Sequence, residues 1–227
     1  MKDKQLMVYE NLRETIYRSL ALCYALPTAD TLAILPDLED ALRNVCDVAA
    51  EAVAALRAEA PSIETLKIDY SRLFIGPFKV LAPPYGSIYL DNARTVMGPS
   101  TADVRNRYRE FGLDISQDFK DAPDHISAEL EFLYYLVFQE LEALKQADVE
   151  SARILLDAQK SFLDAHLGAW VAEFTDRVSA HAETEFYSNL ARATAAFIRC
   201  DLDNIAEISI PKLADVTAGN GHPDNAS

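Results

Sequence analysis

The sequence predicts an all-α protein built as a single helical bundle of about eight or more helices. Apolar residues recur every three or four positions along most of the chain, which is the period of a helix that buries one face. Only 7 glycines and 10 prolines occur among 227 residues, and hydrophobic residues make up 50%. This composition permits long helices and one sizeable core. No stretch shows the alternation that is typical of a half-buried strand.

The first third of the chain contains three predicted helices. The first covers residues 5–26 and the second covers residues 37–59, with a short connection between them. Ser62 is the expected N-cap of the third helix, because a serine hydroxyl can accept a hydrogen bond from a free backbone N–H. This helix is expected to end at Gly76 and Pro77, since proline cannot continue a helical hydrogen-bond ladder.

An irregular segment separates these helices from the rest. Residues 76–98 contain a Gly-Pro pair and a Pro-Pro pair, which favour turns. Ser100 is the expected cap of the next helix, and Gly112 is its expected end. The acidic loop at residues 112–121 is where the bundle would divide, if it divides at all. The remaining predicted helices cover residues 122–145, 149–178 with a bend at Gly168, and 183–199. Residues 1–213 are expected to form one helical domain, and the polar residues 214–227 a disordered tail.

The charge and the cysteines limit the possible partners and the compartment. The formal net charge is −15, so the chain repels nucleic acid; the acidic balance is equally consistent with attraction of a basic partner and with a role in solubility alone. Cys23, Cys46 and Cys200 are odd in number and widely spaced, which is typical of free thiols in a reducing compartment. The N-terminus lacks a signal-peptide core, and nowhere do about 18 apolar residues run together. We expect a cytoplasmic protein that does not insert stably into a membrane.

No motif for catalysis or for a cofactor is found. His125, His166, His181 and His222 do not occur in the spacings typical of metal ligands. Neither a nucleophile elbow nor a phosphate-binding loop is present. The Gly-Pro and Pro-Pro turns cannot replace such a loop, because prolines lack the N–H groups that bind phosphate. The sequence therefore predicts no metal, no cofactor and no enzymatic activity.

One ionisable pair stands at the start of the longest predicted helix. Asp121 is a candidate N-cap there, with Pro123 in the first turn and Asp124 completing a capping box. His125 has no such explanation, because a charged imidazole is unfavourable at the positive end of a helix. From spacing alone, Asp124 and His125 are either structural or part of a binding site.

Three motifs together resemble the TorD/DmsD/NarJ family of molybdoenzyme maturation chaperones. They are YSRLFIGPFKVLAPPYGSIY at residues 70–89, PDHISAELEFLYYL at 123–136, and HLGAW at 166–170 followed by FYSNLARATAAFI at 186–198. The resemblance spans roughly residues 9–199 in the expected order. It implies an all-helical chaperone, monomeric or a domain-swapped homodimer. Its implied partner is the apo form of a molybdenum-cofactor oxidoreductase, bound through its twin-arginine signal peptide or another N-terminal segment until the cofactor is inserted. The sequence does not name this client.

The resemblance also implies binding residues. The candidate peptide-binding residues are Leu73, Phe74, Pro83, Pro84, Tyr85, Tyr89, Asp124 and His125. A basic, apolar peptide requires a hydrophobic groove with carboxylates at its rim. We expect residues 76–91 to form a rigid apolar lip beside a polar corner at residues 123–125, where Asp124 accepts from a peptide arginine. Gly86 stands where many relatives have glutamate, so one acidic contact is expected to be missing.

Other interpretations remain open at this point. Leu73 and Phe74 are equally consistent with core positions, and Trp170 is more typical of a core than of a ligand contact. Tyr70 and Tyr89 favour burial with bonded hydroxyls. Three alternative functions are a NarJ-like factor that binds the body or a remnant N-terminus of a non-exported nitrate-reductase-type enzyme, a permanent subunit of an oxidoreductase, and a weak nucleotide hydrolase.

Overall fold

The computed structural model describes residues 3–59, 61–76, 79–91, 97–116, 121–208 and 210. The described part is helical, as the sequence predicts, and contains no named strand. In chain order the helices are α1 (Asp3–Cys23), α2 (Ala29–Ala33), α3 (Leu35–Leu42), α4 (Asp47–Ala58), α5 (Ile63–Tyr70), the π-helix η1 (Ser71–Ile75), α6 (Ser87–Leu90), α7 (Pro99–Glu110), α8 (Ile126–Lys145), α9 (Val149–Ala165), α10 (Leu167–His181) and α11 (Glu185–Glu207). The expected tail at 214–227 lies outside the described residues.

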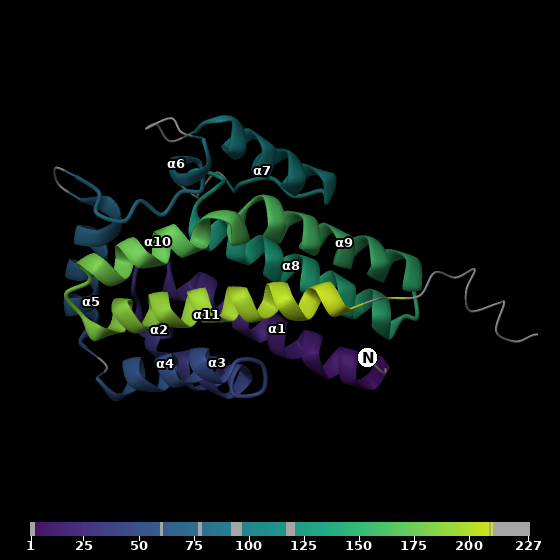
Figure 1. Cartoon of the computed structure of the whole chain (residues 1–227), viewed down its shortest axis with the longest axis horizontal. Helices are drawn as coiled ribbons and strands as arrows, with labels where there is room; N and C mark the ends of the chain where they lie inside the picture. The colour runs from purple at the N-terminus through teal and green to yellow at the C-terminus, as the bar shows by residue number, and fades with distance from the viewer. Residues whose placement is uncertain are drawn as a thin grey trace, which may run out of the picture.

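The long helices enclose one hydrophobic core (Figure 1). α1 packs on α8 and α3, α8 packs on α9, and α11 contacts α4, α9 and α10. The short helices α6 and α7 lie together along one edge, where α6 touches α10. Leu20, Leu133, Phe174 and Phe197 come from four different helices and have no exposed surface. Their burial brings segments from both ends of the chain into the same core.

The predicted helix at residues 37–59 is wrong in its continuity. The chain forms two helices there, α3 and α4, and residue Cys46 has an extended backbone just before α4. The two helices pack on each other, while α3 also contacts α1 and α4 contacts α11. A single straight helix could not reach both partners, so the break follows from tertiary packing.

Helix termini differ from the expectations in an informative way. Ser62 is confirmed as the N-cap of α5, since its Oγ accepts from the Thr65 N–H at 3.2 Å. Ser100 is not the cap of α7; its own N–H and hydroxyl donate to the Asp91 carboxylate, at 3.2 Å and 2.9 Å. Gly112 ends α7 with a φ of +74°, as predicted. The bend expected at Gly168 occurs two residues earlier, between α9 and α10.

The last helix is capped by a residue far away in the sequence. The buried Asp69 of α5 accepts from the N–H groups of Glu183 and Thr184, at 3.1 Å and 2.8 Å, and from the Thr184 hydroxyl at 2.8 Å. It also pairs with Arg72 at 2.9 Å. A carboxylate at a helix N-terminus is favourable because it meets unpaired N–H donors. This contact ties α5 to the start of α11.

A fully buried arginine lies among α1, α8, α9 and α11. Arg13 donates to Asp201 at 2.6 Å, to Glu10 at 2.5 Å and to Gln159 at 2.7 Å. Gln159 in turn donates to Glu140 at 2.6 Å. Burial, together with the nearby Glu10 carboxylate, raises the pKa of Glu140 to about 8. Buried charges need such partners, so this network helps to fix the alignment of four helices.

Candidate functional site

The proline-rich segment and the 123–125 corner lie against each other. The Ile126 N–H donates to the Pro84 carbonyl at 2.8 Å, and the Gly86 N–H donates to the Asp124 carbonyl at 2.9 Å. These two bonds bracket an antiparallel bridge between Tyr85 and His125. The structure therefore places the segment beside the corner, as the sequence led us to expect.

Asp124 is a fully buried residue in the middle of this junction. Its side chain has no exposed surface, and its Oδ2 accepts from the Ser87 N–H at 2.8 Å. Its Oδ1 is buried without a hydrogen-bond partner among the described residues. A peptide arginine cannot reach this carboxylate in the observed conformation, because the residues around Ser87 cover it.

His125, not Asp121, caps α8, so the capping box proposed from the sequence is wrong. Its Nδ1 accepts from the Ser127 N–H at 3.2 Å and lies 2.7 Å from the Ser127 hydroxyl. Burial lowers the pKa of the His125 imidazole to about 4, so the ring is neutral at pH 7. A neutral imidazole can accept a hydrogen bond, which explains a histidine at the positive end of a helix.

A second buried carboxylate lies below the junction. Glu129, one turn into α8, accepts from the Trp170 indole N–H at 3.0 Å. Burial raises the pKa of Glu129 well above its usual range. A Cβ added at Gly86 would lie 2.9 Å from the Trp170 Nε1 and 3.1 Å from the Glu129 Oε1. The backbone at Gly86 thus lies directly against this pair, and a glutamate side chain at this position would have no space.

The aromatic residues of the segment are anchored by their hydroxyls. Tyr85 donates to Asp121 at 2.8 Å, and Tyr89 donates to the Pro83 carbonyl at 2.7 Å. The Tyr89 ring stacks on Trp170 with centroids 5.4 Å apart. Pro83, Tyr85 and Tyr89 keep part of their surface exposed, whereas Pro84 is buried.

Leu73 and Phe74 lie in the core. Leu73 has no exposed surface and Phe74 is 5% exposed. The Phe74 ring packs on Tyr70, with centroids 5.1 Å apart, and on Tyr187, at 5.5 Å. Both residues belong to the π-helix η1, and the Leu73 carbonyl accepts from the Ala82 N–H at 2.9 Å. They support the proline-rich segment from within.

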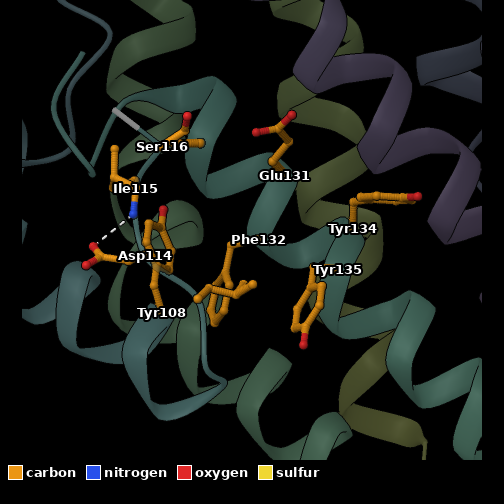
Figure 2. Close-up of a pocket in the computed structure, with 10 residues that line it drawn as sticks. Tyr108, Asp114, Ile115, Ser116, Glu131, Phe132, Tyr134 and Tyr135 are labelled. Carbon is orange, nitrogen blue, oxygen red and sulfur yellow. Dashed lines mark hydrogen bonds between the residues drawn. The ribbon is translucent and has the colours of Figure 1, made fainter. Parts of the chain in front are cut away.

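The surface beside this junction is hollowed. A cavity of about 350 Å³ lies between the start of α8, the end of α7 and residues 113–116 (Figure 2). We call it the aromatic cavity. Its lining residues are Tyr108, Leu113, Asp114, Ile115, Ser116, Ala128, Glu131, Phe132, Tyr134 and Tyr135. The α8 members recur at helical spacing, so one face of α8 forms the floor.

A second cavity continues on the other side of Glu131 and Tyr134. It has a volume of about 690 Å³ and lies between α8, α1 and α2. We call it the alanine cavity. Its lining residues are Arg18, Ala21, Leu22, Ala25, Asp30, Ala33, Ile34, Ser127, Glu131 and Tyr134. Ser127, which bonds to His125, connects this cavity to the corner.

Sequence reasoning missed both cavities. Each is lined by residues from several segments, and no local motif marks them. The available signal was the α8 stripe, on which Glu131 and Tyr134 interrupt a run of apolar residues. A charged and an aromatic residue there are hard to assign to a face until α1 and α7 are placed.

The described residues show no arrangement for a metal or for membrane insertion. No group of three His, Cys, Asp or Glu side chains is arranged to hold an ion within them. None of the helices in those same ranges combines the length and hydropathy of a membrane-spanning segment. Fold and site together define a helical protein with an open, largely apolar groove at the start of α8.

Comparisons with known proteins agree with this description. A family model described as nitrate reductase delta subunit matches residues 33–176. Chaperone protein TorD of Shewanella loihica is 30% identical over 170 residues, covering 73% of this chain and 74% of that protein. Chaperone protein TorD of Photobacterium profundum is 28% identical over 175 residues, covering 76% of each. A crystal structure from Archaeoglobus fulgidus, assigned as a redox enzyme maturation protein, superposes with a TM-score of 0.51 at 25% identity, covering 84% of this chain and 93% of that one. The chain belongs to the TorD/DmsD/NarJ family of redox enzyme maturation chaperones.

Proposed function

We propose that this protein is a cytoplasmic chaperone that binds the N-terminal signal peptide of a molybdenum-cofactor oxidoreductase and holds the apoenzyme until its cofactor is inserted. The observation that carries this proposal is the groove formed by the aromatic and alanine cavities on α8. Both volumes fall in the range of sites that bind ligands specifically. Family membership supports the choice of client class, since the curated relatives are named TorD chaperones.

The groove suits a segment with an apolar stretch and a basic end. Phe132, Leu113 and Ile115 offer apolar contacts in the aromatic cavity, while Glu131 and Asp30 add negative charge beside the alanine cavity. Helical peptides commonly bind by placing one apolar face in such a groove. Small residues lining the alanine cavity allow a helix to approach closely.

The residues inferred by resemblance divide into two roles within this proposal. Pro83, Tyr85 and Tyr89 keep exposed surface outside the two cavities and are proposed to contact the peptide beside the groove. The buried members are proposed to position the groove by joining the proline-rich segment to α8; they are Leu73, Phe74, Pro84, Asp124 and His125.

Calorimetric titration with synthetic twin-arginine signal peptides tests the proposal, with shuffled peptides as controls. We expect saturable one-to-one binding that Ile115→Asp weakens, because a carboxylate would then enter the apolar lining of the aromatic cavity. Ile154→Asp is the matched control, since Ile154 is 49% exposed on α9 and lines neither cavity. Absence of binding by the folded protein to every signal peptide would contradict the proposal.

A second candidate is favoured by the description of the family model as nitrate reductase delta subunit. In that case the client is a non-exported nitrate-reductase-type enzyme, recognised through its remnant N-terminus or its body. A titration with the N-terminal peptides of such enzymes, which lack the arginine pair, separates the two candidates.

A further inference from the structure

A third cavity adjoins the groove at its far end. It has a volume of about 460 Å³ and lies between α1 and α3. We call it the acidic cavity. Its lining residues are Leu12, Glu14, Thr15, Arg18, Ser19, Ile34, Asp37, Asp40, Ala41 and Asn44.

The three cavities adjoin one another, because neighbouring cavities share lining residues, and we call them together the trough. Glu131 and Tyr134 line both the aromatic and the alanine cavity, and in Figure 2 Tyr134 extends toward α1. Arg18 and Ile34 line both the alanine and the acidic cavity. The trough therefore runs from residues 113–116, across α8 and α1, to α3.

The chemistry of the trough changes from one end to the other. At the 113–116 end the lining is mostly aromatic and aliphatic; of its two carboxylates, Asp114 is paired with Arg105 at 3.5 Å, and Glu131 is shared with the alanine cavity. At the α3 end Glu14, Asp37 and Asp40 line the same cavity as one cation, Arg18. Within the described residues, none of these three carboxylates has an ion-pair partner. Asp37 and Asp40 are exposed and Glu14 is partly exposed, so their negative charges can be reached by a partner from solvent.

We infer that the trough binds its peptide in one direction, with the basic residues at Glu14, Asp37 and Asp40 and the apolar stretch toward residues 113–116. This inference rests on the proposed function and adds the polarity of binding and the residues that read the positive charges. It also moves the arginine contact away from Asp124, which is fully covered.

A basic, apolar peptide is the occupant that the charges favour. A second copy of this chain carries a formal net charge of −15 and would be repelled by the acidic end. Nucleic acid would be repelled for the same reason. A segment with two arginines followed by an apolar stretch matches both ends of the trough at once.

The test uses fluorescence anisotropy with a labelled peptide that carries an Arg-Arg pair followed by a Leu/Ala-rich stretch. The double variant Asp37→Lys/Asp40→Lys reverses two exposed charges on α3. The matched control Asp203→Lys/Glu207→Lys makes the same change in net charge on α11, where both residues are exposed and neither lines the trough. We expect roughly a 10-fold loss of affinity for the first variant and roughly no loss for the second.

Two further measurements make the inference specific. Replacing the peptide arginines with glutamine should lower the affinity for the unsubstituted protein. The same replacement should not lower the affinity for the variant Asp37→Lys/Asp40→Lys any further, because that variant has already lost the acidic contacts. A peptide with glutamates in place of the arginines should bind this variant better than it binds the natural sequence. If the lysine variant misfolds, Asp37→Asn/Asp40→Asn provides the same comparison with smaller changes.

The outcomes separate the inference from the proposed function. If Ile115→Asp weakens binding and Asp37→Lys/Asp40→Lys does not, the peptide binds in the groove but the polarity is wrong. If both double variants weaken binding equally, the effect is one of net charge and the acidic cavity is not a subsite. If no signal peptide binds the natural protein, both the inference and the proposed function fail.

Discussion

Tyr85 and His125 face each other across an antiparallel bridge, with ring centroids 5.4 Å apart and ring planes at 70°. They are 40 residues apart in the sequence and belong to two different motifs. Their contact joins the proline-rich segment to the first turn of α8, beside the groove. This junction and the buried groups that hold the bundle can each be tested by substitution.

His125 should make stability pH-dependent while also capping α8. Its pKa is lowered from 6.5 to about 4 by burial, so between these values the unfolded chain binds a proton that the folded chain does not. Stability should therefore fall as pH drops through this window, by at most about 1.4 kcal/mol per pH unit. Urea unfolding of the unsubstituted protein at several pH values between 7 and 4 measures this dependence of the free energy of unfolding on pH.

Two variants separate the titration from the cap. His125→Asn keeps an N-cap acceptor and should flatten the dependence in this window. His125→Ala should lose about 1 kcal/mol at pH 7 as well, because asparagine caps helices and alanine does not. An unchanged slope in both variants would show that other groups cause the acid sensitivity.

Gly86 should tolerate no side chain. Its backbone is helical, so the only obstacle to Gly86→Ala is the contact of the new Cβ with Trp170 and Glu129. Overpacking of this kind costs about 1–3 kcal/mol. Equilibrium denaturation measures this loss of folding stability.

Gly112→Ala is the complementary control. Gly112 has a φ of +74°, and a Cβ added there would meet no atom within 4 Å, so backbone strain alone should act. A left-handed alanine costs about 1–2 kcal/mol. Both variants should lose a similar amount of stability, but Gly86→Ala should bind the signal peptide more weakly than Gly112→Ala. Equal peptide affinities of the two variants would contradict a role for close packing at the junction.

Glu140 should oppose folding at high pH. Its pKa is about 8 in the folded chain and 4.5 as the reference value, so the folded state binds more protons between these values. Stability should therefore decrease as pH rises from about 5 to about 8, by at most about 1.4 kcal/mol per pH unit. Glu140→Gln keeps an acceptor for Gln159 and should be more stable than the natural protein at pH 8 but similar at pH 5.

Thermal melts across this pH range measure the effect of Glu140→Gln. Glu142→Gln is a suitable control, because Glu142 lies on the same helix and pairs at the surface with Lys145. A stabilisation at pH 8 that is equal in both variants would mean that net charge, rather than burial, is responsible.

Asp69 should be important for docking the last helix. Asp69→Ala leaves the Glu183 and Thr184 N–H groups without their acceptor and should cost about 2–3 kcal/mol. Asp69→Asn retains an acceptor and should cost less. Glu173→Ala, which removes an exposed pair with Arg177, should change stability by less than about 1 kcal/mol. Denaturant midpoints of the three variants test this order.

The local sequence was sufficient where neighbouring residues decide the conformation. Ser62 caps its helix through the N–H of Thr65, three positions away, and Gly112 ends a helix through its own backbone. The predictions from sequence were wrong where the residue or helix that decides the local conformation is not an immediate neighbour in the chain. Asp91 replaces Ser100 as the group that caps α7, and the break before α4 depends on α1 and α11.

The candidate site shows the same division. The two motifs were recognised from residues 70–89 and 123–136, and their contact is present in the structure. The sequence could not show which of the candidate residues are exposed, because helical periodicity cannot distinguish a residue that faces a groove from one that faces the core. Leu73 and Phe74 proved to be buried, while Glu131 and Tyr134 stand at the groove.

The sequence by itself determined the all-helical class, most helix positions and the family, because periodicity, turn residues and ordered motifs are local properties of the chain. The tertiary structure alone decided that His125 caps α8, that Asp124 is covered, and that α1, α3, α7 and α8 form a trough. These features arise from side chains far apart in sequence, whose burial, pKa values and accessibility are set only when the helices pack.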